Sequence, residues 1–166
     1  LAHAELLVGH AYIDGVGVAK DDKQGMMYCR KSAEQGFAMA QHFVGVASLH
    51  GTCGAVRDGR DAVHWLRKAA EQGYLDSQLL LGHVFANMPG GVDEDQAQAE
   101  MWWRKAAQLK SAEAQFCLGK LLVSRRTKEG EEAWRAGVEL IRAAAEQNYA
   151  DAVAWRSAND EADPTR

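Results

Sequence analysis

The sequence repeats itself at a nearly constant interval, and this periodicity limits the fold more than any other feature. Four related octapeptides, CRKSAEQG, LRKAAEQG, WRKAAQLK and IRAAAEQN, begin at residues 29, 66, 103 and 141. A second series consists of four glycines spaced 36 or 37 residues apart: Gly9, Gly45, Gly82 and Gly119. A fixed period of about 20–50 residues indicates a repeat architecture, in which each unit buries its apolar side against its neighbours.

Each of these glycines lies in a stretch that we expect to form the first helix of a repeat. Small or apolar residues recur there at positions i, i+3, i+4 and i+7, which is the pattern of an amphipathic helix. A glycine inside a helix costs about 1 kcal/mol relative to alanine. Its recurrence therefore indicates that a second helix packs closely against that side.

The octapeptides predict the end of a second helix in each repeat. Acidic residues suited to the N-terminus of this helix are Asp21, Asp58 and Asp95. Gly36 and Gly73 have the position of left-handed residues that end a helix, and Asn148 can take the same conformation. Lys110 breaks this pattern, so we expect the turn at Lys110 to be stabilised in another way or to fray.

Together these motifs resemble the Sel1-like repeat, a relative of the tetratricopeptide repeat. Repeat 1 supplies Gly9, the loop GVGV at 15–18, Asp21 and KSAEQG, and repeat 2 supplies the equivalent Gly45, Asp58, Trp65 and KAAEQG. The segments NMPGG at 87–91 and SRRTKEGEEAW at 124–134 depart from the loop pattern of the family. The resemblance implies an all-α fold, a right-handed α/α solenoid of helix-turn-helix repeats.

On this basis we expect a single repeat domain over residues 1–158. The repeats would span about 1–36, 37–73, 74–110 and 111–148, followed by a terminal half-repeat at 149–158 and a C-terminal tail at 159–166.

Composition and charge argue against two classes of partner. The net charge is −4 and the sequence pI is about 5.9, without a basic patch, so nucleic acid is not an expected ligand. The apolar runs, such as LLLGHVFA, are too short to cross a bilayer, so we expect no membrane insertion. The three cysteines, Cys29, Cys53 and Cys117, are an odd number without metal-ligand spacing. Unpaired cysteines favour a bacterial cytoplasm over a periplasm, although the sequence leaves the compartment open.

The sequence contains no recognisable catalytic motif. The glycine-rich stretch GVGVAKDDKQG lacks the phosphate-loop pattern, and no serine is followed three residues later by a lysine. We therefore predict no catalytic residue, no cofactor and no metal site.

By analogy with tetratricopeptide repeats, the first helices are expected to line a concave surface that binds a partner. The residues at the corresponding positions are His3, Leu6, His10, Met39, His42, Val46, Leu49, His50, Asp76, Leu79, His83, Glu113, Phe116 and Lys120. The histidines could instead be half-buried helix residues bonded to their neighbours. A metal site is disfavoured because no second histidine follows His10 or His83 at i+4.

The resemblance implies a non-enzymatic protein–protein interaction module, an adaptor or scaffold that binds another protein or a peptide. One alternative is a bacterial toxin-neutralising (immunity) protein or a secretion accessory protein. An alternative from another class is a hydrolase that resembles the penicillin-binding and β-lactamase-like members of the family.

Overall fold

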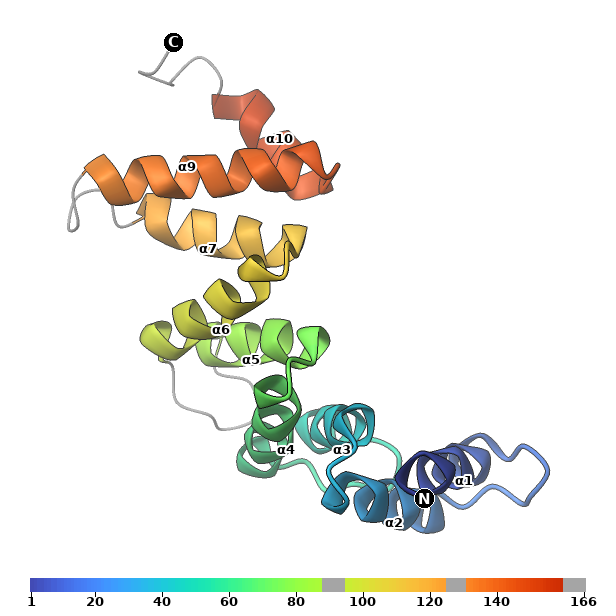
Figure 1. Cartoon of the computed structure of the whole chain (residues 1–166). Helices are drawn as coiled ribbons and strands as arrows, with labels where there is room; N and C mark the ends of the chain where they lie inside the picture. Colours follow the sequence, from blue (N-terminus) through green and yellow to red (C-terminus); the bar gives the residue numbers. More distant parts are fainter. Residues whose placement is uncertain (88–94, 125–130, 160–166) are drawn as a thin grey trace. The chain divides into compact units, whose positions relative to one another are not determined.

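The computed structural model is helical throughout the parts of the chain that it describes, residues 1–87, 95–124 and 131–159 (Figure 1). No strand occurs in these ranges, which confirms the predicted all-α class. The helices are α1 (Ala2–Asp14), α2 (Asp22–Glu34), α3 (Ala38–His50), α4 (Gly59–Glu71), α5 (Leu75–Asn87), α6 (Gln96–Gln108), α7 (Ala112–Ser124), α9 (Glu131–Glu146) and α10 (Ala150–Asn159). The divergent loop segments at 87–91 and 124–134 and the tail at 159–166 lie largely outside the described residues.

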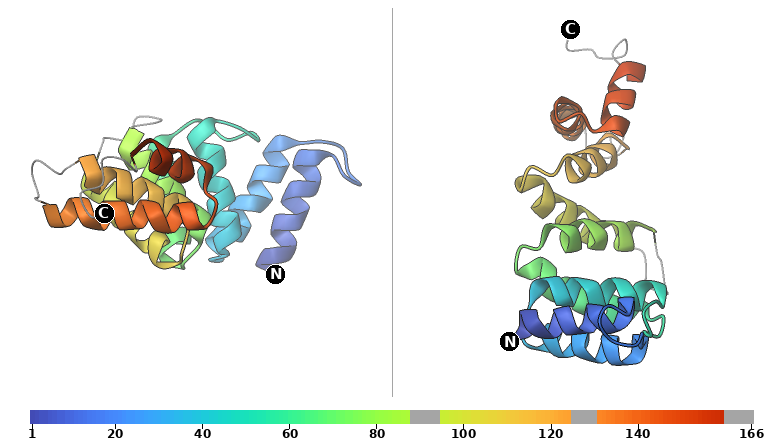
Figure 2. Two further views of the ribbon diagram at one scale, coloured as in Figure 1. Left: turned by 90° about the horizontal axis from the view of Figure 1, so that it is seen from above. Right: turned by 90° about the vertical axis from the view of Figure 1, so that its right-hand side faces the viewer.

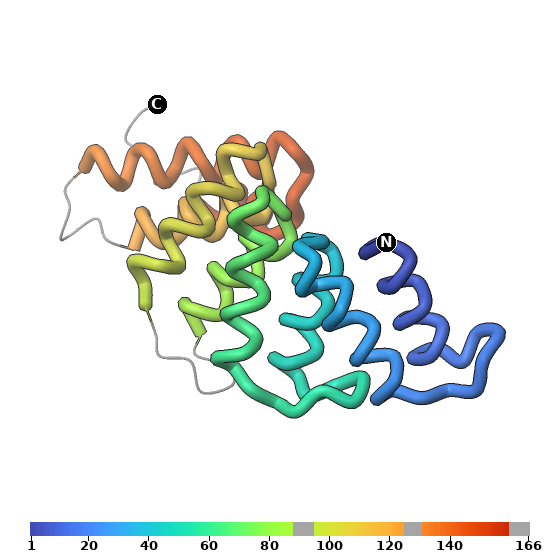
Figure 3. Tube along the Cα trace, turned by 60° about the horizontal axis from the view of Figure 1, so that its bottom comes forward, coloured from blue at the N-terminus to red at the C-terminus, as the bar shows by residue number. Residues whose placement is uncertain are grey.

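The helices pair as the repeat pattern predicts. The chain divides into two compact units, Leu1–Ala99 and Glu100–Arg166. In the first unit α1 packs along α2 and α3 along α4, while α2 also contacts α3 and α4 contacts α5 (Figures 2 and 3). In the second unit α9 packs against both α7 and α10. The first helix α3 therefore lies between its own second helix, α4, and the second helix of the preceding repeat, α2.

The recurring glycines are points of backbone contact between paired helices. A Cβ atom added to Gly9 would lie 2.5 Å from the Sγ atom of Cys29, and one added to Gly119 would lie 2.6 Å from the side chain of Ile141. An added Cβ at Gly45 meets the next helix in the same way. Real Cβ contacts are never this short, so the helices approach so closely only because these positions have no side chain.

The second helices begin where the sequence predicts. The carboxylates of Asp21, Asp58 and Asp95 each accept hydrogen bonds from backbone N–H groups of the first turn, at distances of 2.8 to 3.2 Å. These bonds satisfy amides that have no partner within the helix and so fix the first turn of each second helix.

The prediction for the end of the third repeat was wrong. Lys110 has a φ of 61° and takes the left-handed conformation that Gly36 (φ 88°), Gly73 (φ 86°) and Asn148 (φ 60°) also adopt. Its backbone N–H donates to the carbonyl of Ala107 at 2.9 Å. The backbone N–H of Gly36 donates in the same way to the carbonyl of Ala33. The turn is thus the same as in the other repeats, and the lysine is held in a conformation that favours glycine.

The glutamine of the AEQG motif connects successive helices. The Gln35 amide donates to the carboxylate of Glu5, and the Gln72 amide donates to Oε1 of Gln41 at 2.7 Å. Gln41 in turn donates to the carbonyl of Ala33 at 3.0 Å, at the end of the preceding second helix. The motif therefore recurs because it links the two helices of a repeat and joins that repeat to its neighbour.

A charged cluster joins the second helices of repeats 1 and 2. Arg30 donates to Asp61 at 2.8 Å, and Ser48 and the Trp65 indole N–H donate to the same carboxylate at 2.7 and 3.1 Å. Burial alone would raise the pKa of Asp61, but the bonds from Arg30 and Ser48 and the charge of Arg30 together lower it.

We expect Gly9→Ala to destabilise the protein by about 1–3 kcal/mol, because the new Cβ cannot fit against α2 without moving it. Urea unfolding followed by circular dichroism measures the change. The control is Ala4→Gly on the exposed side of α1, which measures helix preference alone and should cost about 1 kcal/mol. If helix preference decided both changes, Gly9→Ala would stabilise the protein, which would contradict the packing role of Gly9.

We expect Lys110→Gly to stabilise the protein by about 0.5–1 kcal/mol. A left-handed backbone costs an ordinary residue about 1–2 kcal/mol, and the greater freedom of glycine in the unfolded chain offsets part of this gain. Lys110→Ala is the matched control and should give no gain, since alanine has the same steric cost. A Lys110→Gly variant that melts at the temperature of the Lys110→Ala variant would contradict the expectation.

Candidate functional site

Most of the predicted binding residues of the first unit reach the surface of α1, α3 and α5. Some of them are exposed and the others are half-buried. We call the surface that they form the first-helix face. It consists of His3, His10, Met39, His42, Val46, His50, Asp76, Leu79 and His83.

Ring contacts join consecutive first helices along this face. The ring of His10 on α1 lies 4.8 Å from that of Phe43 on α3, and His42 on α3 lies 5.1 Å from Tyr74 at the start of α5. The ring of His3 meets Phe37 edge-on at 5.6 Å. The alternative interpretation of the histidines therefore holds in part, because these three rings pack on neighbours and still reach the surface.

The structure places three of the predicted binding residues in the core. Leu6, Leu49 and Phe116 are 2%, 3% and 8% exposed. Leu6 belongs to the core between α1, α2 and α3, and Leu49 packs with residues of α4 and α5. Their role here is to hold the helices together, so the surface open to a partner rests on the other predicted residues.

The remaining predicted residues lie on α7, in the second unit. The Lys120 ammonium lies 5.4 Å from the centre of the Phe116 ring, which packs 5.4 Å from the ring of Tyr149. Glu113 is half-buried near Tyr149, and its negative charge adds to the burial that raises the pKa of this tyrosine. These residues belong to the second unit and are not counted in the first-helix face.

Sequence reasoning missed a series of aromatic residues against which predicted binding residues pack: His3 on Phe37, His42 on Tyr74 and Phe116 on Tyr149. Phe37, Tyr74 and Tyr149 each follow the left-handed residue that ends a second helix. Their recurrence after Gly36, Gly73 and Asn148 was a detectable signal. The register taken from tetratricopeptide repeats begins inside the first helix, so it leaves out the aromatic residue that precedes this helix.

His42 has the most defined environment on the first-helix face. Its Nδ1 atom lies 2.9 Å from the Ser77 hydroxyl, which is buried. Burial lowers the pKa of His42, and the negative charge of Asp76 opposes this shift only in part. The ring is therefore kept neutral at pH 7, where it can accept or donate a hydrogen bond without the cost of burying a charge.

The cysteines show no feature of activated nucleophiles. All three are free, and burial raises the pKa of both Cys29 and Cys117 to about 11. Cys53 is half-buried at a φ of 52°. Among the described residues no group of three or more His, Cys, Asp or Glu side chains is arranged to hold a metal ion.

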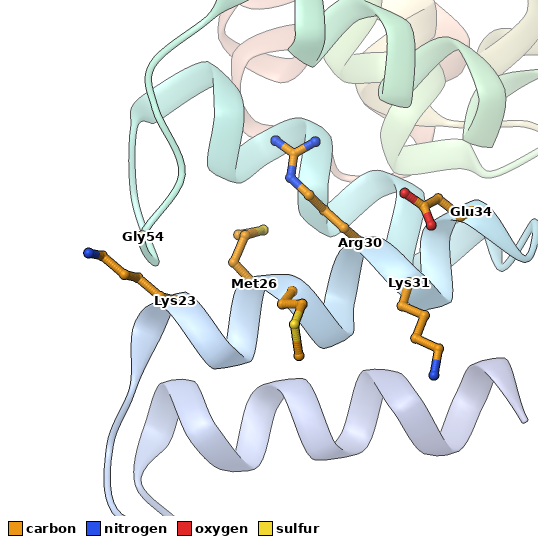
Figure 4. A pocket seen from close by; sticks show the side chains of 7 residues that line it. Lys23, Met26, Arg30, Lys31, Glu34 and Gly54 are labelled. Carbon is orange, nitrogen blue, oxygen red and sulfur yellow. The ribbon is translucent and has the colours of Figure 1, made fainter.

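A shallow hollow of about 640 Å³ lies beside α2 (Figure 4). The residues around it are Lys23, Met26, Met27, Arg30, Lys31, Glu34 and Gly54. Two of its cations are already engaged, since Arg30 pairs with Asp61 at 2.8 Å and Lys31 with Glu5 at 3.0 Å. The hollow therefore has little charge left for a ligand, and we do not assign it a role.

Comparison with known proteins identifies the family of three of the repeats. The family model described as Sel1 repeat matches residues 2–37, 38–74 and 75–111. No curated protein matches the chain. None of the described helices is both long and apolar enough to span a membrane.

Two solved structures resemble the chain over most of its length. One is a protective antigen present in uropathogenic Escherichia coli strains that displays an SLR fold, with 32% identity, a TM-score of 0.72 and coverage of 88% of this chain and 30% of that one. The other is a Sel1 repeat protein from Oxalobacter formigenes, with 26% identity, a TM-score of 0.78 and coverage of 96% of this chain and 63% of that one. The chain thus spans less than two thirds of either protein.

We expect the stability of the protein to decrease as the pH falls below about 6.5, in part because of His42. The pKa of His42 is lower in the folded than in the unfolded protein, so the unfolded chain binds a proton first. The stabilisation from the neutral ring is complete above the unfolded pKa and is lost as the pH falls through the folded one. Urea unfolding at pH 7.5 and 5.5 should show a smaller loss for His42→Gln, and an equal loss in both proteins would contradict this role.

Proposed function

The chain belongs to the Sel1 repeat family, and on that premise we propose that it binds a partner protein or peptide through its first-helix face. The match to the family model and the similarity to the two solved structures confirm the predicted family and its solenoid fold class. Proteins of this family are commonly protein-interaction modules and typically act as non-enzymatic binding scaffolds. The partner and the surface are our own proposal.

The observation that carries the proposal is the chemistry of the first-helix face. Met39 is 46% exposed, and the half-buried side chains of Val46 and Leu79 lie on the same side of the first helices. The imidazoles of His10 and His42 lie beside them, and each packs against an aromatic ring, Phe43 and Tyr74 respectively. Apolar surface that surrounds a few fixed polar groups is typical of protein-binding sites, in which the apolar groups provide affinity and the polar groups provide orientation.

The rings also make the face stiff before any partner arrives. His42 is held by the Ser77 hydroxyl and the Tyr74 ring, and His10 by the Phe43 ring. A partner would therefore lose less side-chain entropy here than on a surface of free long side chains. This rigidity favours recognition of an extended or helical segment with apolar anchors.

Met39→Glu tests the proposal directly. We expect the affinity for a partner captured from the source organism to fall at least about tenfold, because the carboxylate would be buried under a docked apolar group. The measurement is a titration of the purified partner against the parent and the variant by calorimetry. Circular dichroism should show the same fold for both proteins, since Met39 is partly exposed and its side chain does not hold the core.

The control is Met27→Glu, which makes the same change at a similar exposure, 52%, on α2 instead of a first helix. We expect Met27→Glu to bind with the parental affinity. Equal losses in both variants would indicate a nonspecific effect of charge. Parental affinity in Met39→Glu would place the partner elsewhere and overturn the proposal.

A further inference from the structure

The start of α5 carries an exposed carboxylate beside two packed rings. We call His42, Tyr74 and Asp76 the ring–acid site. The rings of His42 and Tyr74 lie 5.1 Å apart and are half-buried, while Asp76 is exposed in the first turn of α5. Burial raises the pKa of Tyr74, and the negative charge of Asp76 raises it further. The same charge acts on the pKa of His42, so the carboxylate lies near both rings.

The second unit contains the same arrangement together with a cation. Phe116, Tyr149 and Asp151 have the same repeat positions as the three residues of the ring–acid site, and the two aromatic rings lie 5.4 Å apart. Lys120 follows Phe116 by one helical turn, and its ammonium lies 5.4 Å from the centre of the Phe116 ring. In this unit the chain therefore supplies the cation that such a combination of groups attracts.

In the first unit the chain supplies no cation at this place. Val46 has the position of Lys120, one turn after His42. Within the described part of this unit no lysine or arginine pairs with Asp76. The helices α1, α3 and α5 contain no lysine or arginine. The cations of the first unit all lie on second helices or in the loops before them: Lys20, Lys23, Arg30, Lys31, Arg57, Arg60, Arg67 and Lys68.

The repeat does not require a carboxylate at the position of Asp76. His3 and Met39 stand there in the first two repeats. The helix α3 has no acidic residue in its first turn and is as long as α5, 13 residues. An acidic first turn adds only slightly to helix stability. Folding alone therefore does not account for an unpaired carboxylate beside these two rings.

We propose that the ring–acid site binds a cationic side chain of the partner, with arginine preferred to lysine. The proposal rests on the proposed function, because His42 and Asp76 belong to the first-helix face. A guanidinium donates two parallel N–H groups to a carboxylate and stacks on an aromatic ring with its planar face, whereas an ammonium is a point charge. The His42 ring, whose pKa is lowered by burial, is neutral at pH 7 and does not repel the cation.

Apolar surface borders the ring–acid site on both helices. Leu79 follows Asp76 by three residues on α5, Val46 follows His42 by four residues on α3, and both are half-buried. The methylene groups of an arginine can cover this surface while its head reaches the carboxylate. The partner segment should therefore carry an arginine next to its apolar anchors.

NMR titration with the amide of N-acetyl-arginine, at about pH 7.5 and constant ionic strength, tests the site without a partner. The probe should shift the backbone amide signals of Tyr74 and Asp76 and the ring signals of His42. We expect a dissociation constant of about 10–100 mM, because the probe gains one exposed cation–π contact and one exposed ion pair. The uncharged amide of N-acetyl-glutamine should not shift these signals.

Three variants separate the site from a general effect of charge. Asp76→Asn should raise the dissociation constant of the probe at least about threefold, because the ion pair is lost. Val46→Lys should raise it at least about fivefold, because the chain then carries its own cation at the position that Lys120 has in the second unit. Glu34→Gln removes a negative charge from the exposed end of α2 and should leave the dissociation constant unchanged. Unchanged signals elsewhere in the spectra verify folding.

The captured partner provides the second readout. Asp76→Asn should lower its affinity at least about threefold, and parental affinity in this variant would overturn the proposal. So would parent signals that do not move at up to about 200 mM of the arginine probe, or equal dissociation constants of the probe for the parent and Asp76→Asn. These failures leave the proposed function standing if Met39→Glu still weakens partner binding. Parental affinity in Met39→Glu overturns the proposed function, whatever the probe does.

Discussion

The whole arrangement depends on the contact between two helices at positions that have no side chain. Gly9 and Gly119 allow their helices to approach α2 and α9 until backbone meets backbone, and Gly25 and Gly137 stand on the opposite sides of these contacts. At this distance the small residues of both helices interlock, and the apolar stripes face the neighbouring repeats. A larger residue at any of these points would separate the hairpin and disturb the surfaces against which the next repeat packs.

Polar contacts set the register between one repeat and the next. Apolar packing alone has little direction, so a stack of similar helices could slide by a turn at small cost. The bond from Gln41 to the Ala33 carbonyl and the pair of Arg30 with Asp61 are satisfied in one alignment only. Because these groups are partly buried, the loss of a partner would leave a donor or a charge without compensation. The polar motif thus specifies the stacking that the apolar stripe stabilises.

The apolar stripe and the polar contacts thus account for stability and register. The surface residues of the helices are left free to vary, and we expect function there. The first-helix face combines imidazoles with apolar side chains over supporting rings such as Phe43 and Tyr74.

The sequence by itself determined the period, the helices and their ends, because each depends on local chemistry: Asp21 and Asp58 cap a first turn, and the recurring glycines mark a close approach. It did not separate Leu6, which is buried, from Leu7, which is exposed, since both fit an apolar stripe and only the placement of the neighbouring helices distinguishes them. Nor did it reveal that Lys110 would take a left-handed conformation, which the bonds of the surrounding turn impose. Tertiary structure decided the burial of Leu6 and the exposure of Leu7, because burial depends on contacts between residues that are distant in the chain.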